Sequence, residues 1–541
     1  MKTIFRNMLA GTLCASTLAL TGCLEETFPN SYATADQLAS SSKATEALMW
    51  EMPAFVNNLG TYDDSYANDW GYGSIMHMHD VMTADMAVVA HGYNWYTSWS
   101  ANIYLGERYA NPYIPWAFYY KAIQTTNNII GAVDEANASD AQKGYLGAAH
   151  AYRALYYLDM AQTYEFLPSD VRPDGLSSAG KNIVNLTAPI VTEKTSETAA
   201  RNNPRATRDS MFNFIIEELD KAEEQIPYLT ETSKTLPHLA CVYGLKARAY
   251  MWVAQYDSAY AYAAKAINQK DKYNNHAIMT QEEWLSTTSG FNDLACKSFM
   301  WGAQTSKEDD VVQTGILNWT SWMSNETSYG YSGAGPFIMI ASDLYNKIDN
   351  NDFRKLSFKA PATNPLSGSE PIISEELFEG MPTYSSLKFR PGQGNTEEYI
   401  VGSVGAYPLM RYEEMYFIAA EAAARLGDAA TAKSLLSAVM SVRNPSYNCK
   451  ASTAEEVAEE VFLQKRVEFF GEGVIFFDYK RLNKSVDRTT SSNWDVSENF
   501  KTEGRPAWMT WCIPYAEGSQ NHALEDYMNP DPSNLYTPVA K

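Results

Sequence analysis

Two stretches of the sequence are rich in tryptophan and tyrosine, whose rings can stack and also form hydrogen bonds. Between Trp70 and Trp116 there are ten Trp or Tyr residues and no Phe, and a second group occupies 319–331. A ring with a polar tip can pack its flat face against an apolar surface, such as the CH face of a sugar, and still meet water. The candidate ligand-binding residues are Trp70, Tyr72, Tyr93, Asn94, Trp95, Trp99, Trp319, Trp322, Tyr329 and Tyr331.

Polar side chains that could bind hydroxyl groups are interleaved with these rings. Asp69, Asn94, Asn102 and Arg108 accompany the first group, and Asn318 and Asn325 accompany the second. We interpret the two groups as two walls of one binding surface. The alternative is that the same rings fill an irregular part of the fold.

Motifs for catalysis or metal binding are weak. Residues 330–334 approach a G-x-S-x-G elbow but end in Ala334, and no strand-to-helix pattern surrounds them. His77 and His79 lack a further pair of ligand residues in a chain with seven His. We therefore expect no metal, no cofactor and no enzymatic activity. A carboxylate pair for glycoside hydrolysis stays open, since 64 acidic residues always offer candidates.

Composition limits the class of protein. Of 541 residues, 45% are hydrophobic, which is too much for a disordered chain. The formal net charge is −22, so a role that requires a basic surface for nucleic acid is disfavoured.

The N-terminus has the features of an export signal. Lys2 and Arg6 precede a short apolar stretch over 8–20, which is too short to span a bilayer. It ends in a Leu-Thr-Gly-Cys sequence that resembles the bacterial lipoprotein signal, with Cys23 as the lipidated residue; the alternative is an ordinary signal peptide with an incidental Cys. We predict a signal peptide over 1–22 and attachment to a membrane through the lipid alone. Removal of the signal lowers the charge from −22 to −24.

Four cysteines remain beyond the anchor: Cys241, Cys296, Cys449 and Cys512. Outside the cytoplasm they could pair in three ways. A buried free thiol is equally compatible with the apolar helical pattern around Cys241.

Amphipathic helices are predicted over 211–226, and as two helix pairs over 239–267 and 409–442. The pairs resemble each other, because small residues recur at similar places, from Ala259 in the first and from Ala432 in the second. This pattern is typical of tetratricopeptide units. We predict a mainly α fold with a scaffold at about 116–270 and 407–485. Irregular ligand-face regions with a few short strands are predicted at about 60–115 and 271–406.

Several motifs occur in an order that covers nearly the whole chain. They are Trp116-x-x-x-Tyr120-x-x-Ile123-x-x-x-Asn127; Arg153-Ala-Leu-Tyr-Tyr-Leu158; Leu245-Lys-Ala-Arg-Ala-Tyr250; Arg411-Tyr-Glu-Glu414; Lys465-Arg466-x-Glu468-Phe-Phe-Gly-Glu472-Gly; Phe477-Asp478-Tyr-Lys-Arg481; and Ile513-Pro-x-x-Glu517-x-x-x-Asn521. Together with the lipoprotein signal, they resemble the SusD/RagB family of outer-membrane nutrient-binding lipoproteins.

The resemblance implies a single SusD-like domain over 23–541, with tetratricopeptide-like helix pairs and an irregular ligand face. It also implies a partner, a SusC-like TonB-dependent outer-membrane transporter, and a glycan ligand captured at the cell exterior. Two alternatives stay open: a peptide ligand on the same fold, and a surface glycoside hydrolase. The charged residues of the motifs, such as Glu468 and Asp478, are interpreted as a structural network at a helix end.

Overall fold

The computed structural model describes residues 42–89, 93–269 and 275–541. The predicted signal peptide and Cys23 lie outside these residues. The fold is mainly helical, as predicted, and its few strands are short. In the described part of the chain, no helix combines the length and apolar character needed to cross a membrane.

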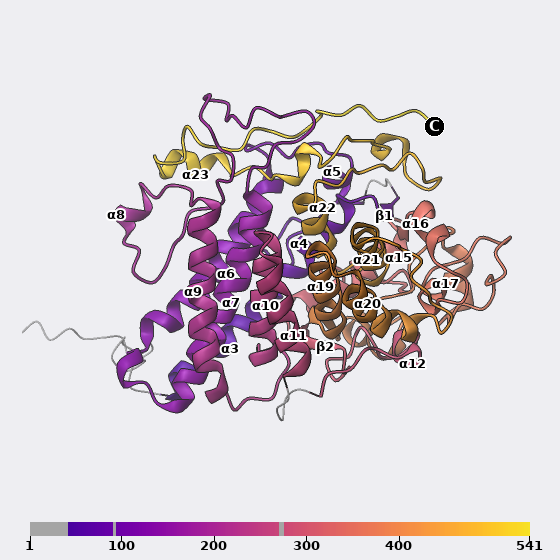
Figure 1. Cartoon of the computed structure of the whole chain (residues 1–541), viewed down its shortest axis with the longest axis horizontal. Helices are drawn as coiled ribbons and strands as arrows, with labels where there is room; N and C mark the ends of the chain where they lie inside the picture. The colour runs from indigo at the N-terminus through magenta and orange to yellow at the C-terminus, as the bar shows by residue number, and fades with distance from the viewer. Residues whose placement is uncertain (1–41, 90–92, 270–274) are drawn as a thin grey trace, which may run out of the picture.

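Ten helices form the scaffold, with the N-terminal ones on the left of Figure 1 and the C-terminal ones on the right. They are α3 (Ser42–Phe55), α6 (Ala110–Ala132), α7 (Asp140–Tyr164), α9 (Arg208–Gln225), α10 (Leu239–Trp252), α11 (Tyr256–Asn268), α19 (Tyr412–Arg425), α20 (Ala429–Arg443), α21 (Ala454–Glu468) and α22 (Ile475–Arg481).

Shorter helices occupy the connecting segments. They are α4 (Tyr72–Val81), α5 (Thr97–Ser100), α8 (Glu197–Ala200), α12 (Gln281–Trp284), α13 (Asp310–Gln313), α14 (Trp319–Met323), α15 (Tyr331–Ala334), α16 (Ser342–Lys347), α17 (Glu375–Gly380), α18 (Tyr399–Gly402) and α23 (Tyr515–Gln520).

The four strands within the described ranges form two antiparallel pairs. β1 (Met86–Val88) pairs with β3 (Ile338–Ile340), and β2 (Phe299–Gln304) pairs with β4 (Ala406–Arg411). All residues of β1 and β3 are buried. The β1–β3 pair therefore ties the first aromatic segment of the sequence to the second.

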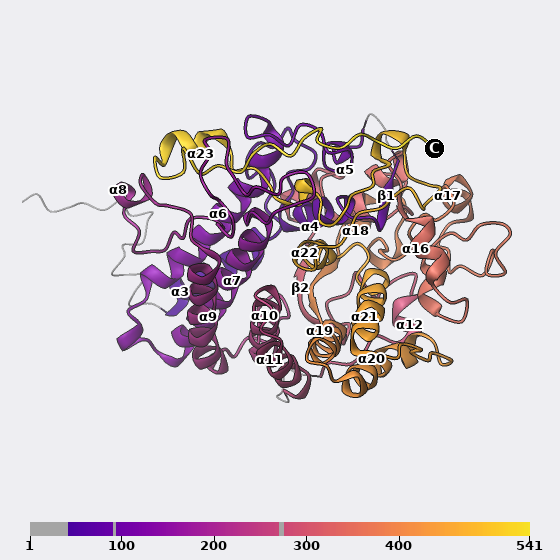
Figure 2. The same ribbon diagram turned by 45° about the horizontal axis from the view of Figure 1, so that its top comes forward.

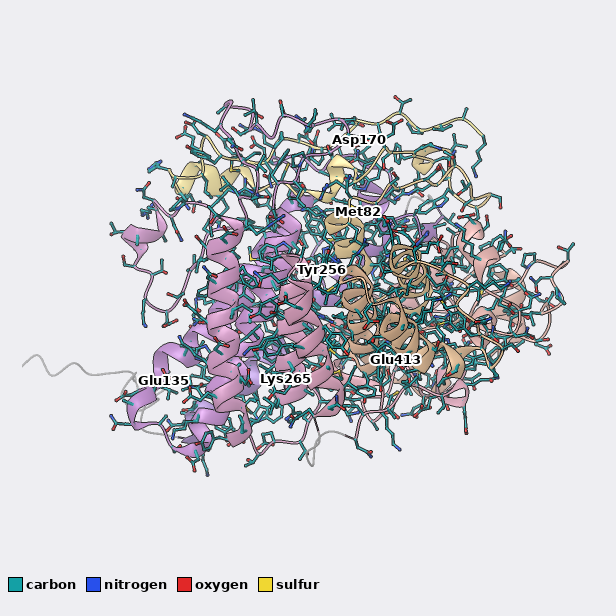
Figure 3. All side chains as sticks on the ribbon, viewed as in Figure 1. Met82, Glu135, Asp170, Tyr256, Lys265 and Glu413 are labelled. Carbon is teal, nitrogen blue, oxygen red and sulfur yellow. The ribbon has the colours of Figure 1, made fainter. Side chains whose placement is uncertain are left out.

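The two predicted helix pairs lie next to each other although about 170 residues separate them in the sequence. α10 packs on α11, α11 packs on α19, and α19 packs on α20. Lys265 on α11 and Glu413 on α19 are labelled in Figure 3. Ala259 and Ala432 are fully buried, so small side chains let the helices approach closely. The long insertion between α11 and α19 does not separate these two helices, which still pack against each other.

Local sequence determines several helix ends. Ser139 and Gln142 form a capping box at the start of α7, and Thr207 caps α9. Within α7, a Cβ at Gly147 would lie 2.5 Å from the backbone nitrogen of Ile226. Only glycine lets the segment after α9 cross α7 this closely.

Two elements differ from the sequence predictions. Residues 409–411 belong to β4 and not to the second helix pair, because all six residues of the strand are buried beside β2. α4 lies in a stretch predicted to be irregular. All ten of its residues are buried, so it lacks the polar face that makes a helix visible in a sequence.

Charged residues, some of them from the sequence motifs, form buried ion pairs around Glu468. Its carboxylate accepts hydrogen bonds from Arg354 at 3.1 Å, Arg411 at 3.1 Å and Arg443 at 2.8 Å. Burial raises its pKa, but the surrounding arginines lower it more strongly, so the pKa lies well below the ordinary value. The network joins α20, α21 and β4, as the structural interpretation requires.

A further ion cluster from the same motifs joins three C-terminal helices. Asp478 on α22 pairs with Lys465 on α21 and with Arg481, and Arg481 also pairs with Glu421 on α19 at 2.6 Å. The motif residues of the sequence therefore hold the scaffold together.

The C-terminal segment runs across the top of the molecule, as Figure 2 shows. Met82 and Asp170, labelled in Figure 3, hold it in place. The indole of Trp508 donates to the Met82 carbonyl at 3.0 Å, and the Tyr536 hydroxyl donates to Asp170 at 2.5 Å.

The four cysteines beyond the predicted anchor are free thiols. Burial raises the pKa of Cys296 to about 11. The sequence left disulfides and free thiols open as alternatives, and the structure shows free thiols.

Candidate functional site

Residues 93–96, directly before α5, present two rings to solvent. Tyr93 is 68% exposed and Trp95 is 40% exposed. The alternate residues, Asn94 and Tyr96, are buried. The Asn94 amide donates to the Val89 carbonyl at 3.2 Å, and its oxygen accepts from the Tyr96 backbone at 3.0 Å. Asn94 therefore fixes the loop so that alternate residues point outward.

A strip of rings continues from Trp95 across the surface. The Trp95 ring lies 6.0 Å from that of Tyr66, Tyr66 lies 5.8 Å from Tyr62, and Tyr62 lies 5.4 Å from Tyr113. Tyr62 is 41% exposed. We call these four residues the Trp95 strip. Tyr62, Tyr66 and Tyr113 were not among the site residues predicted from the sequence.

Asp69 holds the segment that carries Tyr62. Its buried carboxylate accepts from the backbone nitrogens of Tyr62 at 2.7 Å and Asp63 at 3.0 Å. Burial raises the pKa of Asp69 against these hydrogen bonds. The sequence at 60–66 has no periodic pattern that would have predicted these site residues. The signal that could have found them is the presence of two Tyr residues close to Trp70.

Six of the ten predicted ligand residues are covered by protein: Asn94 and the five rings of Trp70, Tyr72, Trp99, Trp319 and Trp322. The Trp70 indole donates to the Tyr96 hydroxyl at 2.9 Å, and the Trp322 indole donates to the Ala67 carbonyl at 3.1 Å. Trp319 stacks on Tyr407 at 4.4 Å. The indoles of Trp70 and Trp322 use their polar tips inside the fold, and Trp319 packs there through its ring faces and edges.

Tyr72 and Trp99 have comparable internal partners. The Tyr72 hydroxyl donates to Asp159, and the Trp99 ring lies 4.6 Å from that of Trp511. Burial raises the pKa of Asp159 to about 6. Both rings therefore join the first segment to other parts of the core.

Tyr329 and Tyr331 from the second segment are partly exposed. Tyr331 stacks on Trp322 with ring centroids 4.3 Å apart. Burial raises the pKa of Tyr331, and the neighbouring Tyr93 raises it further. Tyr331 therefore lies within electrostatic range of Tyr93, which belongs to the other predicted group.

The two histidines considered as metal ligands face different surroundings. His77 lies edge-on to Tyr96 with centroids 4.2 Å apart, and His79 stacks on Phe476 at 4.5 Å. Burial lowers the pKa of each to about 3. Among the described residues, no group of three or more His, Cys, Asp or Glu side chains is arranged to hold a metal ion.

Ser332, the serine of the incomplete G-x-S-x-G motif, has a structural role. The Ser332 hydroxyl donates to the Ser321 carbonyl at 2.9 Å, and the residue lies in the short helix α15. This hydroxyl holds α15 against α14.

Taken together, the fold and the exposed rings define a helical protein with an aromatic surface on its irregular face. Comparison with known families identifies it further. Residues 345–530 match the model of the SusD family, and residues 36–251 match a SusD-like model described as "Starch-binding associating with outer membrane". The chain belongs to the SusD family.

Solved structures from this superfamily share the fold. A SusD-like carbohydrate binding protein from Bacteroides vulgatus ATCC 8482 superposes with a TM-score of 0.69 at 20% identity, covering 89% of this chain and 97% of its own. A SusD superfamily protein from Bacteroides thetaiotaomicron VPI-5482 gives 0.68 at 18% identity, covering 91% and 100%. No curated protein matches the chain.

Proposed function

We propose that the protein binds a glycan on its exposed rings and delivers it to a SusC-like TonB-dependent transporter of the outer membrane. The observation that carries this proposal is the exposure of Tyr93 and Trp95 at the start of the Trp95 strip. An exposed Trp beside several Tyr rings offers flat apolar faces together with hydroxyl groups. The carbohydrate-binding and starch-binding descriptions of its relatives support the same ligand class.

Hydrogen bonds hold two parts of the proposed binding surface in place. Asn94 fixes the loop of Tyr93 and Trp95, and Asp69 fixes the segment of Tyr62. Preformed rings lose little conformational entropy on binding, so each contact contributes more to affinity. Of the candidates from the sequence, Tyr93, Trp95, Tyr329 and Tyr331 are the rings that we place in contact with the glycan.

Charge next to the strip favours a neutral glycan over an anionic one. Asp63 and Asp64 are exposed beside Tyr62. Hydrogen bonds from Ser65 lower the pKa of Asp63, so this carboxylate is charged at neutral pH. A uronic acid or sulfated sugar placed there would meet like charge.

The sequence and the family description support a proposed cellular location. We propose a lipid anchor at Cys23 that holds the protein to the outer membrane, with the bulk of the chain at the cell exterior. The matching model described as associating with the outer membrane supports this location. Replacement Cys23→Ser is expected to release the protein from the membrane fraction.

A binding screen with matched variants tests the function. Wild type, a Tyr93→Ala/Trp95→Ala double variant and a Tyr228→Ala control are run in affinity gels containing starch and other plant, host and microbial polysaccharides. Tyr228 is 40% exposed and lies outside the strip, so it controls for loss of an exposed ring. We expect retention of the wild type and the control by at least one polysaccharide, and loss of retention for the double variant.

Three other outcomes of the screen would contradict the proposal. Equal retention of all three proteins would move the site away from the strip. Retention by none, together with capture of peptides, would favour the peptide alternative, which uses backbone partners and pockets. Release of reducing sugar, abolished by one carboxylate substitution, would show a hydrolase.

Coupling to a transporter is tested on the native membrane. Affinity purification of the protein from detergent-solubilised outer membranes is expected to recover a large barrel protein with it. Recovery of the protein alone would count against delivery to a transporter, and it would leave glycan binding unaffected.

A further inference from the structure

A cavity of about 210 Å³ lies where several helix ends meet, away from the Trp95 strip. It is lined by residues from the ends of α7, α10 and α22, from the start of α9 and from the C-terminal segment. Tyr256, labelled in Figure 3, begins α11 two residues after Ala254, which is exposed at the cavity mouth. The glycan surface shares no residue with this lining.

The lining carries four cationic side chains and one carboxylate. The cations are Arg208, Lys480, Arg481 and Arg505, and the carboxylate is Glu165. This balance is opposite to that of the whole chain, whose net charge is −22. A local excess of positive charge in such a chain calls for a physical cause.

The available carboxylates are already paired with two of the cations. Glu165 accepts from Arg208 at 2.5 Å and from the Trp252 indole at 3.0 Å. Arg481 pairs with Glu421 and Asp478, each at 2.6 Å. Lys480 and Arg505 therefore carry the excess charge.

Neither of these two cations forms an ion pair within the described residues. The Lys480 ammonium, 2% exposed, donates to the Thr163 carbonyl at 3.0 Å. Arg505 donates from Nη1 to the Lys480 carbonyl at 2.5 Å, and its buried Nε has no hydrogen-bond partner. An ammonium offers three donors and a guanidinium offers five, so most of this capacity is unused.

Electrostatics in the cavity agree with the hydrogen bonds. Burial lowers the pKa of Lys480 well below its ordinary value, Glu165 opposes this, and Arg505, Arg205 and Arg208 lower the pKa further. The carbonyls at the ends of α7 and α22 carry only the partial charge of a helix terminus, about half an elementary charge each. They offset part of the positive charge, and no carboxylate of the described residues forms an ion pair with Lys480 or Arg505.

We propose that this cavity binds a small oxyanion (a phosphate, sulfate or carboxylate group) held by Lys480, Arg505 and Arg208. Guanidinium and ammonium donors form charge-assisted hydrogen bonds with such groups, and a planar arginine matches two oxygens at once. The anion arrives either as a free ion or as a substituent of a larger molecule whose remainder projects past Ala254. This site is independent of the proposed glycan surface.

Titration calorimetry of the purified full chain tests the site with named probes. Inorganic sulfate and inorganic phosphate are compared with chloride at matched ionic strength. We expect saturable binding of sulfate or phosphate and none of chloride. Glucose 6-phosphate distinguishes the two sources: binding as tight as that of phosphate, or tighter, indicates a substituent, and exclusion of the sugar phosphate indicates a free ion.

Substitutions then locate the site. Arg505→Gln is expected to weaken anion binding at least tenfold. Arg172→Gln is the matched control, because Arg172 also donates to a single backbone carbonyl and has an unpartnered Nε, but does not line the cavity. The proposal is overturned if no anion binds saturably, or if both variants weaken binding equally.

A second pair of variants leaves the buried residues unchanged. Ala254 is exposed at the mouth, so a charge placed there alters the potential without affecting the core. Ala254→Asp should weaken anion binding several-fold, and Ala254→Lys should strengthen it. Identical affinities for the two variants would contradict the cavity as the binding site, even if Arg505→Gln failed to fold.

Discussion

The two aromatic segments have similar compositions and different roles. In the first, the loop over 93–96 alternates exposed and buried residues, so Tyr93 and Trp95 face solvent. In the second, α14 is buried on every side, and both Trp319 and Trp322 are covered. The Trp322 indole donates to the Ala67 carbonyl, and Trp319 stacks on Tyr407. The comparison teaches that a polar tip on a ring meets an internal acceptor as readily as it meets water.

The largest expected difference between the segments is in stability. Trp322 is 1% exposed, stacks on Tyr331 and donates to the Ala67 carbonyl. Trp322→Ala should therefore lower the free energy of unfolding by about 3–5 kcal/mol. Trp95→Ala removes a half-exposed ring and should change it by less than about 0.5 kcal/mol. Urea unfolding of the two variants checks the contrast, and equal losses would remove the distinction between the segments.

The next prediction tests how far the exposed binding surface extends along the strip. Tyr62 was not predicted from the sequence, yet it lies in the Trp95 strip at 5.8 Å from Tyr66. If a glycan chain follows the strip, Tyr62→Ala should weaken binding of a retained polysaccharide about tenfold, which corresponds to 1.4 kcal/mol. Stability should be unchanged. Affinity gels with Tyr228→Ala as the control measure this, and unchanged retention would end the site at Trp95.

The stability of the folded protein is expected to depend on pH through the buried His77. His77 lies against Tyr96 and 6.3 Å from Trp322, and burial lowers its pKa from 6.5 to about 3. Between these values the unfolded chain binds a proton at His77 that the folded chain does not, so stability falls as pH falls. The loss is about 1.4 kcal/mol for each pH unit below 6.5.

Comparison with a non-titrating variant isolates this contribution. The pKa of Asp159 is raised to about 6 and that of Glu498 to about 7, and such carboxyls change stability in the opposite direction. His77→Gln retains these groups, so its loss of stability from pH 7.5 to 5.5 should be about 1 kcal/mol smaller than in wild type. Urea unfolding at the two pH values gives the difference, and parallel losses would contradict a buried neutral His77.

The sequence predicted helices such as α9 and α11 well because each buries one face. The pair formed by α10 and α11 and the small residues at Ala259 and Ala432 follow from periodicity alone. α4 escaped prediction because it is buried all round, and residues 409–411 because apolar residues of a buried strand resemble the start of a helix.

The candidate site was only partly predictable, for a different physical reason. Whether Trp95 or Trp319 faces solvent depends on which distant residue covers it, and Tyr407 covers Trp319 from 88 positions away. The Trp95 strip also depends on residues from three segments, before α4, before α5 and on α6, that only the fold brings together. Periodicity carries no information about such contacts, so composition could identify the two segments and not their exposed members.

The smallest expected effect concerns the contact between the segments. Tyr331 stacks on buried Trp322 and neighbours exposed Tyr93, so it belongs to both the packing and the surface. Tyr331→Phe retains the stacked ring and removes only the hydroxyl. Stability should then change by less than about 0.5 kcal/mol, because the stacking is preserved. If the hydroxyl binds glycan, affinity should fall about threefold, since one hydrogen bond contributes roughly 0.5–1.5 kcal/mol. Isothermal titration with a retained oligosaccharide measures this, and unchanged affinity would assign Tyr331 to packing alone.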